Sequence, residues 1–284
     1  MLDQYKELGT VRYGESGIRC LYGIKAAKKE PAFLPHWHDR MELLVVEQGS
    51  IELYLDEIPT TLGPGQLGIV PPHVLHGGIC QETDTVFHAL MFEVERFENG
   101  TGASEKWLRS LIQGKLRFPN VTDNRKAVEQ AQSLAEYLHR PEGSGLEAVG
   151  QLYMLLGSLC HLSTPVSRTA PARTESLRSV LDYMDAHFTE PLTVRDISRE
   201  FSYNETYFCR RFKKATGLTV MEYIRILRLE LAEKLLRTET CEIRDIAWRC
   251  GFSDESYFSR AFRLYSGNTP GEYRRKNKKS KFYI

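Results

Sequence analysis

The sequence predicts a multidomain α+β protein, in which an N-terminal β-barrel with following helices precedes a C-terminal all-α domain with two helix-turn-helix motifs. Short strand-like segments fill residues 1–98, helical periodicity follows over 99–163, and an internal repeat lies within 176–284. The 284 residues suffice for two or more cores, and a 42% hydrophobic and 26% charged composition excludes a disordered chain or a coiled-coil rod.

The barrel is predicted from runs rich in β-branched and aromatic residues at 41–48, 50–56, 66–70 and 84–94. Glycine and proline clusters separate these runs. Short strands at such regular spacing favour a barrel or sandwich over a parallel sheet with crossover helices.

Residues 99–163 carry apolar side chains at three- and four-residue intervals, which predicts helices. The last of them, at 145–163, is apolar around much of its circumference, so we expect it to be buried between domains or between subunits. Residues 164–175 are rich in Ser, Thr, Pro and Ala and are the predicted linker.

The C-terminal domain contains a repeat. The segments 207–225 and 257–275 are identical at nine of 19 positions, and 194–204 parallels 243–253. Such self-similarity indicates two copies of one supersecondary unit. Between the copies, residues 221–238 contain no Gly or Pro and predict a stiff helix of ~27 Å.

Each copy is predicted to be a short helix, a tight turn and a second helix. In the second copy Gly251 supplies the left-handed turn, and Asp254 or Ser253 caps the helix that follows. Phe258 and Phe262 are four residues apart and therefore face the core together. The outward-facing side chains are Thr206, Cys209, Arg210 and Lys213 in the first copy and Ser256, Ser259, Arg260 and Arg263 in the second.

This arrangement predicts binding to double-stranded DNA. A helix-turn-helix places its second helix in the major groove, where Arg bonds guanine and Ser or Thr reach several bases. A helical connector of ~27 Å can hold two such motifs in successive grooves, because one turn of DNA is ~34 Å.

The net charge of +1 conceals an asymmetry. Residues 1–173 hold 17 basic and 21 acidic residues, a net of −4, whereas 174–284 hold 21 basic and 16 acidic residues, a net of +5. A basic module joined to an acidic one agrees with a DNA-binding C-terminal domain.

The C-terminal domain resembles the AraC/XylS family of bacterial transcription regulators over roughly 176–276, most specifically in IRDIAWRCGFSDESYFSRAFRLYSGNTPGEYRR. The resemblance implies a DNA-binding regulator, usually an activator, that works with RNA polymerase. The first copy departs from the family pattern, with Ser198 in place of Ala and Ser202 in place of Gly. By position, the resemblance implies base contacts by Thr206, Cys209 and Arg210, and by Glu255, Ser256, Ser259 and Arg260.

The barrel sequence contains a candidate binding site. His36, His38 and Glu42 share parity, so on one extended strand their side chains face one side, and His76 follows in a second segment. Three imidazoles and a carboxylate suit Fe, Mn, Ni, Co or Zn, although no cofactor is required by the sequence. Trp37 and Tyr54 are candidate sugar-stacking surfaces, and His88 is a further candidate effector contact.

These segments resemble the two cupin motifs. The first fits the spacing His-x-His-(three)-Glu-(six)-Gly, while in the second His73 replaces a glycine and Cys80 stands where Asn is usual. A cupin barrel before two helix-turn-helix motifs is the architecture of sugar-responsive AraC-like regulators, and it implies that 99–163 is the dimerisation segment of a homodimer.

Three functions therefore remain open for the chain. The first is a regulator, not an enzyme, that senses a sugar or small metabolite through His36, Trp37, His38, Glu42, Tyr54, His76 and His88. The second is a metal-dependent cupin enzyme. The third is a DNA-binding protein whose barrel serves only dimerisation. We expect a cytoplasmic protein without membrane association, because no signal peptide or membrane span is evident and the six cysteines form no CxxC pair.

Overall fold

The structure is a computed structural model that describes residues 11–13, 17–55, 58–81, 84–97, 103–140, 145–166 and 175–279. The chain divides into two compact units. Unit 1 comprises residues 1–178 with 214–217, and unit 2 comprises 179–213 with 218–284.

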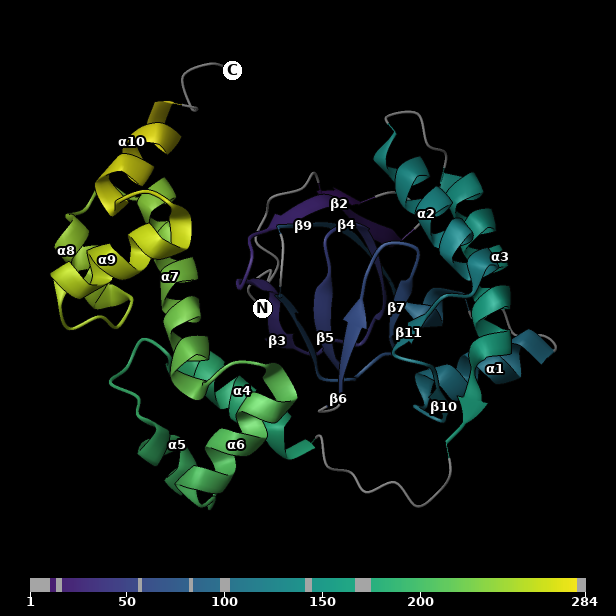
Figure 1. The fold of residues 1–284 in the computed structure, drawn as a ribbon, viewed down its shortest axis with the longest axis horizontal. Helices are drawn as coiled ribbons and strands as arrows, with labels where there is room; N and C mark the ends of the chain where they lie inside the picture. Colours follow the sequence, from purple (N-terminus) through teal and green to yellow (C-terminus); the bar gives the residue numbers. More distant parts are fainter. Residues whose placement is uncertain are drawn as a thin grey trace. The chain divides into compact units, whose positions relative to one another are not determined.

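Unit 1 is built on two antiparallel sheets (Figure 1). The larger has the strand order β1-β2-β9-β4-β7-β11, and the smaller has the order β3-β8-β5-β6. The strands of the larger sheet are β1 (Val11–Tyr13), β2 (Ile18–Ala26), β9 (Thr85–Phe92), β4 (Met41–Gln48), β7 (Leu67–Val70) and β11 (Val121–Thr122). Those of the smaller are β3 (Pro31–His36), β8 (His76–Cys80), β5 (Ile51–Leu55) and β6 (Ile58–Leu62).

Side-chain alternation along the strands gives unit 1 two cores. On β4, Leu44 and Val46 point into the space between the sheets, where they join Leu53 of β5 and Phe87 of β9. Leu43 and the other residues of opposite parity point outward to a second core shared with the helices. Because successive strand residues face opposite sides, one β-strand serves both cores.

Three helices cover the outer face of the larger sheet. They are α1 (Ala103–Ile112), α2 (Arg125–His139) and α3 (Gly145–Leu162). Helix α2 packs on β2, β4 and β9, and α3 packs on α2 (Figure 1). The prediction of helices within 99–163 is confirmed.

Several elements of unit 1 differ from the sequence prediction. The strand expected at 84–94 ends at Phe92, and a short 3-10 helix, η1 (Val94–Phe97), follows. β2, β3, β6 and β8 have no counterpart among the predicted strands. The predicted linker 164–175 starts with a short strand, β12 (Thr164–Pro165), which pairs with β10 (Leu116–Arg117). Residues 167–174 of that linker lie outside the described residues.

Unit 2 is entirely helical within its described residues. Its elements are α4 (Glu175–His187), α5 (Val194–Glu200), α6 (Glu205–Thr216), α7 (Val220–Thr238), α8 (Ile243–Arg249), α9 (Glu255–Ser266) and α10 (Pro270–Lys279). The predicted helix-turn-helix pairs are therefore α5–α6 and α8–α9, joined by α7. The side chains of Phe208, Phe212, Phe258 and Phe262 are all buried, as the four-residue spacing predicts.

The same helix C-terminal cap ends the first helix of both motifs. In α5–α6, the Tyr203 amide donates to the Ser198 carbonyl, and in α8–α9 the Phe252 amide donates to the Ala247 carbonyl. Such a cap requires a left-handed residue just before the donor. Gly251 fills that position with φ +83°, and Ser202 fills it with φ +55°.

The second helix of each motif also begins as predicted. The side chain of Asn204 accepts from the Tyr207 amide, and the side chain of Asp254 accepts from the Tyr257 amide. These N-caps place the two recognition helices, α6 and α9. Among the described residues, no helix is long and apolar enough to cross a membrane.

Candidate effector and DNA-binding sites

Four predicted residues of the barrel converge on one point. His36 ends β3, His38 lies in the following turn, Glu42 is on β4, and His76 begins β8. Their nearest ligand atoms all lie within 4.8 Å of one another. Glu42 and His76 are fully buried, His36 is nearly so, and the His38 side chain is 15% exposed.

The convergence does not arise from a shared strand. The prediction that His36, His38 and Glu42 face one side of a single extended strand is wrong, because β3 ends at His36 and β4 starts at Met41 in the other sheet. The turn between the two sheets folds His38 over Glu42. The cluster therefore bridges both sheets at one end of the barrel.

Backbone carbonyls fix the orientation of all three imidazoles. Each carbonyl can only accept, so each contacting Nδ1 carries a hydrogen and a neutral ring presents the lone pair of Nε2. The contacts join His36 Nδ1 to Leu34 O at 2.8 Å, His38 Nδ1 to Arg40 O at 3.0 Å, and His76 Nδ1 to Val74 O at 2.9 Å. Metal-binding histidines are held in the same way.

The Glu42 carboxylate lies against two of these rings. Its Oε2 is 3.1 Å from His38 Nε2 and 3.0 Å from His76 Nε2. Burial alone would raise the pKa of Glu42, but the bonds to His38 and His76 outweigh it and hold that pKa well below its ordinary value. A buried carboxylate against imidazole nitrogens requires a positive charge between them, which a proton or a metal cation can supply.

His36 and His38 respond differently to this environment. Burial and the neighbouring His76 lower the pKa of His36 to about 3, so its ring is neutral at pH 7. Burial also opposes the charged form of His38, but its bond to Glu42 prevails and raises its pKa. The site thus offers a negative charge, a hydrogen-bond donor and a neutral imidazole.

The remaining predicted effector residues, Trp37, Tyr54 and His88, are not among the four residues of the cluster. Trp37 lies between two of its members and is 36% exposed. Tyr54 has the opposite parity to the interior residues of β5, and its hydroxyl donates to Glu52 at 2.7 Å. His88 faces the helical side of β9, where its ring stacks on Tyr22 at 4.0 Å between centroids. Tyr54 and His88 thus lie outside the interior site.

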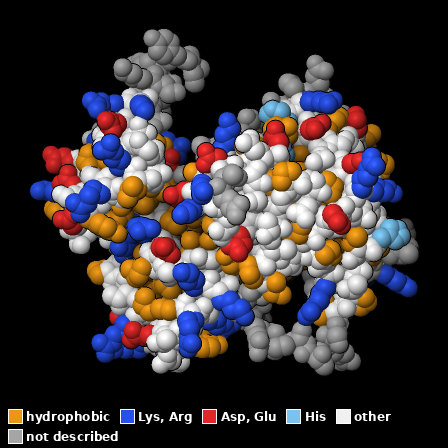
Figure 2. All heavy atoms as spheres, viewed as in Figure 1, with side chains coloured by type: hydrophobic (Ala, Val, Ile, Leu, Met, Phe, Trp, Pro, Cys, Tyr) orange, Lys and Arg blue, Asp and Glu red, His pale blue; other side chains and the backbone are white. Residues whose placement is uncertain are grey.

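The predicted DNA-contacting side chains lie on the outer faces of the recognition helices. Thr206, Arg210 and Lys213 on α6 are exposed, as are Glu255, Ser256, Arg260 and Arg263 on α9, whereas Cys209 and Ser259 are half-buried. In the part of the chain that the structure describes, the guanidinium groups of Arg210 and Arg260 make no side-chain hydrogen bond or ion pair. Figure 2 shows Lys and Arg interspersed with Asp and Glu over unit 2. Binding by such a surface depends on placed contacts more than on bulk charge.

Comparison with known protein families agrees with this division. Residues 21–181 match the family described as the AraC-like ligand binding domain, and residues 197–276 match a helix-turn-helix domain. The chain therefore belongs to the AraC family of transcription regulators: it joins a ligand-binding barrel to a DNA-binding domain. These matches favour a regulator over the cupin-enzyme interpretation.

The chain also matches named proteins over most of their length. The chain is 28% identical over 274 residues to the HTH-type transcriptional activator RhaS of Salmonella arizonae, covering 94% of this chain and 96% of that protein. It is 27% identical over 250 residues to RhaS of Escherichia coli, covering 85% and 87%. Among solved structures, ToxT from Vibrio cholerae matches at 12% identity with a TM-score of 0.44, covering 92% of this chain and 98% of ToxT.

Proposed function

We propose that the protein is a cytoplasmic, homodimeric transcription activator, not an enzyme, that responds to a sugar or a similarly polar small metabolite. The observation that carries the proposal is the pairing of two exposed recognition helices with a buried polar cluster in the barrel. The similarity to proteins named transcriptional activators supports activation, which would include contact with RNA polymerase.

The effector site of this proposal is the cluster of His36, His38, Glu42 and His76, with the adjacent Trp37, which is 36% exposed. A carboxylate and oriented ring nitrogens bind hydroxyl groups, and the indole offers an apolar face to a sugar ring. Binding shifts the regulator only if the effector prefers one of its conformations.

Fluorescence anisotropy tests this proposal. The probe is a duplex selected from a random-sequence library by the wild-type protein, and a panel of sugars and sugar acids is screened by thermal shift. A stabilising compound should change the Kd for this duplex in the wild type but not in Glu42→Gln. His88→Asn is the matched control outside the cluster. No sequence-specific binding at low salt, with or without any compound, contradicts the proposal.

We further propose that the cluster holds one divalent ion, of Fe, Mn, Ni, Co or Zn. The donor set fits: three imidazoles with Nδ1 tied to carbonyls and one buried carboxylate are suitable ligands, and their atoms are close enough to share one ion. The ion would neutralise Glu42 and provide a Lewis-acid contact for effector oxygens. Among the described residues this is the group that meets these criteria.

Metal analysis tests this second proposal. Mass spectrometry of the purified protein should find about one ion per chain, and a Co²⁺ titration should give a ligand-field absorption band. Both should be lost in His76→Asn and retained in His88→Asn, with circular dichroism confirming that both variants fold. Metal-free protein that binds no added Co²⁺ contradicts the proposal and leaves effector binding without metal in place.

The homodimer is proposed from α3. Its inner face packs on α2, but its outer face also carries apolar or small residues, of which Leu146 is 84%, Tyr153 40% and Met154 61% exposed. Gly150 lies four residues after Leu146, and Gly157 lies three residues after Met154; these small residues allow close helix approach. Analytical ultracentrifugation should show a dimer for the wild type, a monomer for Met154→Lys, and a dimer for the control Glu147→Lys.

A further inference from the structure

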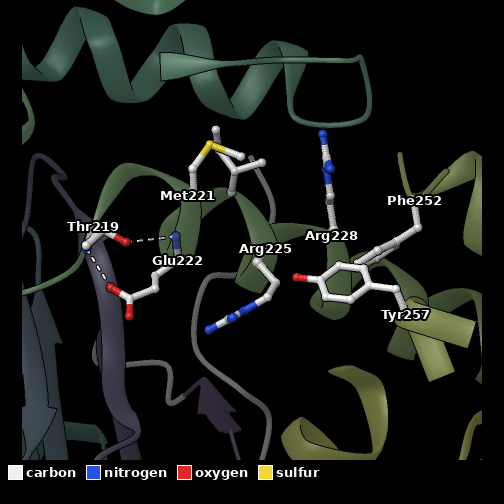
Figure 3. Close-up of a pocket in the computed structure, with 8 residues that line it drawn as sticks. Thr219, Met221, Glu222, Arg225, Arg228, Phe252 and Tyr257 are labelled. Atoms are coloured by element: carbon white, nitrogen blue, oxygen red, sulfur yellow. Dashed lines mark hydrogen bonds between the residues drawn. The ribbon is translucent and has the colours of Figure 1, made fainter. Parts of the chain in front are cut away.

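A recess lies on α7 in unit 2, with a volume of about 210 Å³. It is formed where the N-terminal half of α7 meets the turn of the second helix-turn-helix motif and the start of α9 (Figure 3). We call it the α7 recess. Its lining residues are Thr219, Met221, Glu222, Ile224, Arg225, Arg228, Phe252 and Tyr257.

One of its two guanidinium groups is committed to the fold. Arg228 Nε donates to the Phe188 carbonyl at 2.6 Å, and Arg228 Nη2 donates to the Glu190 carbonyl at 2.8 Å. The same guanidinium lies 5.9 Å from the centre of the Phe252 ring. These contacts tie the loop between α4 and α5 to the second motif, so the charge of Arg228 is fixed in the wall of the recess.

Two other donors are available. In the described chain, neither the exposed Arg225 guanidinium nor the Tyr257 hydroxyl makes a hydrogen bond. Tyr257 is 46% exposed, and its ring packs 6.0 Å from that of Phe252. In Figure 3 its hydroxyl points toward the part of α7 that carries Arg225 and Arg228.

The charge of the recess favours an anion. Its acid, Glu222, is engaged in the helix cap, where its carboxylate accepts from the Thr219 amide at 2.7 Å. Burial opposes the charged form of Glu222, but its hydrogen bonds with Thr219 hold its pKa below the ordinary value, and the charges of Arg225 and of Lys213 on α6 lower that pKa further. A cation of the first recognition helix therefore adds to the positive field of a recess that already holds two arginines.

The position of α7 identifies the source of that anion. When α6 and α9 occupy successive major grooves, the DNA backbone bordering the intervening minor groove passes between them. In that arrangement α7 would span this stretch, because it joins the two motifs. Phosphate oxygens are the usual partners of Arg and Tyr donors that do not contact bases.

We propose that the α7 recess binds one backbone phosphate of the DNA between the two major-groove segments, with Arg225 and Tyr257 as its donors and Arg228 as a fixed positive wall. The inference rests on the DNA-binding function. Because this contact is to the DNA backbone and not to the bases, it positions α6 and α9 relative to each other and carries no sequence preference of its own.

The salt dependence of DNA binding tests the proposal. The probe is the duplex selected by the wild-type protein, titrated at several KCl concentrations. Arg225→Gln should weaken binding about tenfold and reduce the slope of log K against log[salt] by ~0.9, the loss of one phosphate contact. Arg237→Gln, at the other end of α7, is the matched control and should leave the slope unchanged. Tyr257→Phe should weaken binding less than Arg225→Gln does.

A second arm locates the phosphate. Single methylphosphonate substitutions along the duplex should include one position that weakens wild-type binding but not binding by Arg225→Gln. Equal slopes for Arg225→Gln and Arg237→Gln overturn the inference, while sequence-specific binding by the wild type would still uphold the DNA-binding function. Inorganic phosphate that raises the Tm of the wild type but not of Arg225→Gln, without any slope change, would assign the recess to a free anion and also overturn it.

Discussion

The equivalent turn positions Ser202 and Gly251 should respond in opposite directions to substitution. Both are left-handed, with φ of +55° and +83°. For a residue with a Cβ, this conformation costs ~1–2 kcal/mol. Ser202→Gly relieves that strain but adds ~0.5–1 kcal/mol of unfolded-state entropy. The free energy of unfolding of unit 2 should therefore rise by about 0.5 kcal/mol.

Gly251→Ala has additional costs. A Cβ at this position would lie 2.7 Å from the Thr189 carbonyl oxygen and 2.9 Å from Nε of Arg228, a side chain whose guanidinium donates to two carbonyls. Strain of ~1–2 kcal/mol and overpacking of ~1–3 kcal/mol are offset by ~0.4–1 kcal/mol of unfolded-state entropy. We expect the free energy of unfolding of unit 2 to fall by about 2–3 kcal/mol.

The assay must follow unit 2 separately, because a two-unit chain need not unfold in one step. Trp248 is the only tryptophan in residues 179–284. Its ¹⁹F resonance in 5-fluorotryptophan-labelled protein therefore reports this unit during urea unfolding. Ser202→Ala, which keeps the Cβ and removes the hydroxyl, is the control and should be nearly neutral. The strain argument is refuted if Ser202→Gly destabilises while Ser202→Ala does not, or if Gly251→Ala is neutral.

Three further outcomes are expected. Arg260→Ala should cost ~1–3 kcal/mol of DNA binding and relax preference at one base pair, whereas Lys278→Ala should weaken all sequences alike; binding to a set of mutated duplexes distinguishes them. If the cluster holds the proposed ion, a chelator should lower the Tm of unit 1 in calorimetry, because an ion present at 100 times its Kd stabilises by ~2.7 kcal/mol. Burial lowers the pKa of His88, so the folded state binds fewer protons than the unfolded one. The free energy of unfolding should therefore be unaffected by His88 above pH ~6.5 and fall below that pH by up to ~1.4 kcal/mol per pH unit. In urea titrations, His88→Gln should lose less of this free energy on acidification than the wild type does.

The sequence predicted the elements whose pattern is local. β4 coincides with the predicted 41–48, and the four core phenylalanines and both N-caps in unit 2 follow from spacing and cap chemistry. β3 and β8 escaped prediction because Pro31, Pro35, Gly77 and Gly78 weaken any strand signal. The close packing between β3 and β8 explains the glycine at position 78, because a Cβ on Gly78 would lie 2.7 Å from the Phe33 ring.

The candidate site was predicted by residue type but not by geometry. The spacing of His36, His38 and Glu42 suggested one strand, whereas a turn between two sheets brings them together. Strand alternation also determines which face of its sheet the side chain of Tyr54 or His88 occupies, but only when the neighbouring interior residues are already known. Arg225 and Tyr257 could not be identified from periodicity, because their relation depends on how α7 packs against α9.

The position of the cluster suggests how a barrel can respond to a small ligand. His36 and His76 belong to the smaller sheet, while Glu42 belongs to the larger one. The chain connections β3–β4 and β7–β8, each of which joins the two sheets, lie at the same end of the barrel. The rings are already held by carbonyls, so little ordering is needed when a cation or effector binds. We infer that a ligand bonding Glu42 and the imidazoles together would stabilise this arrangement of the two sheets over any arrangement in which they separate. The size of the response is then set by that difference in affinity, and replacing Glu42 should remove it even where the sheets still form.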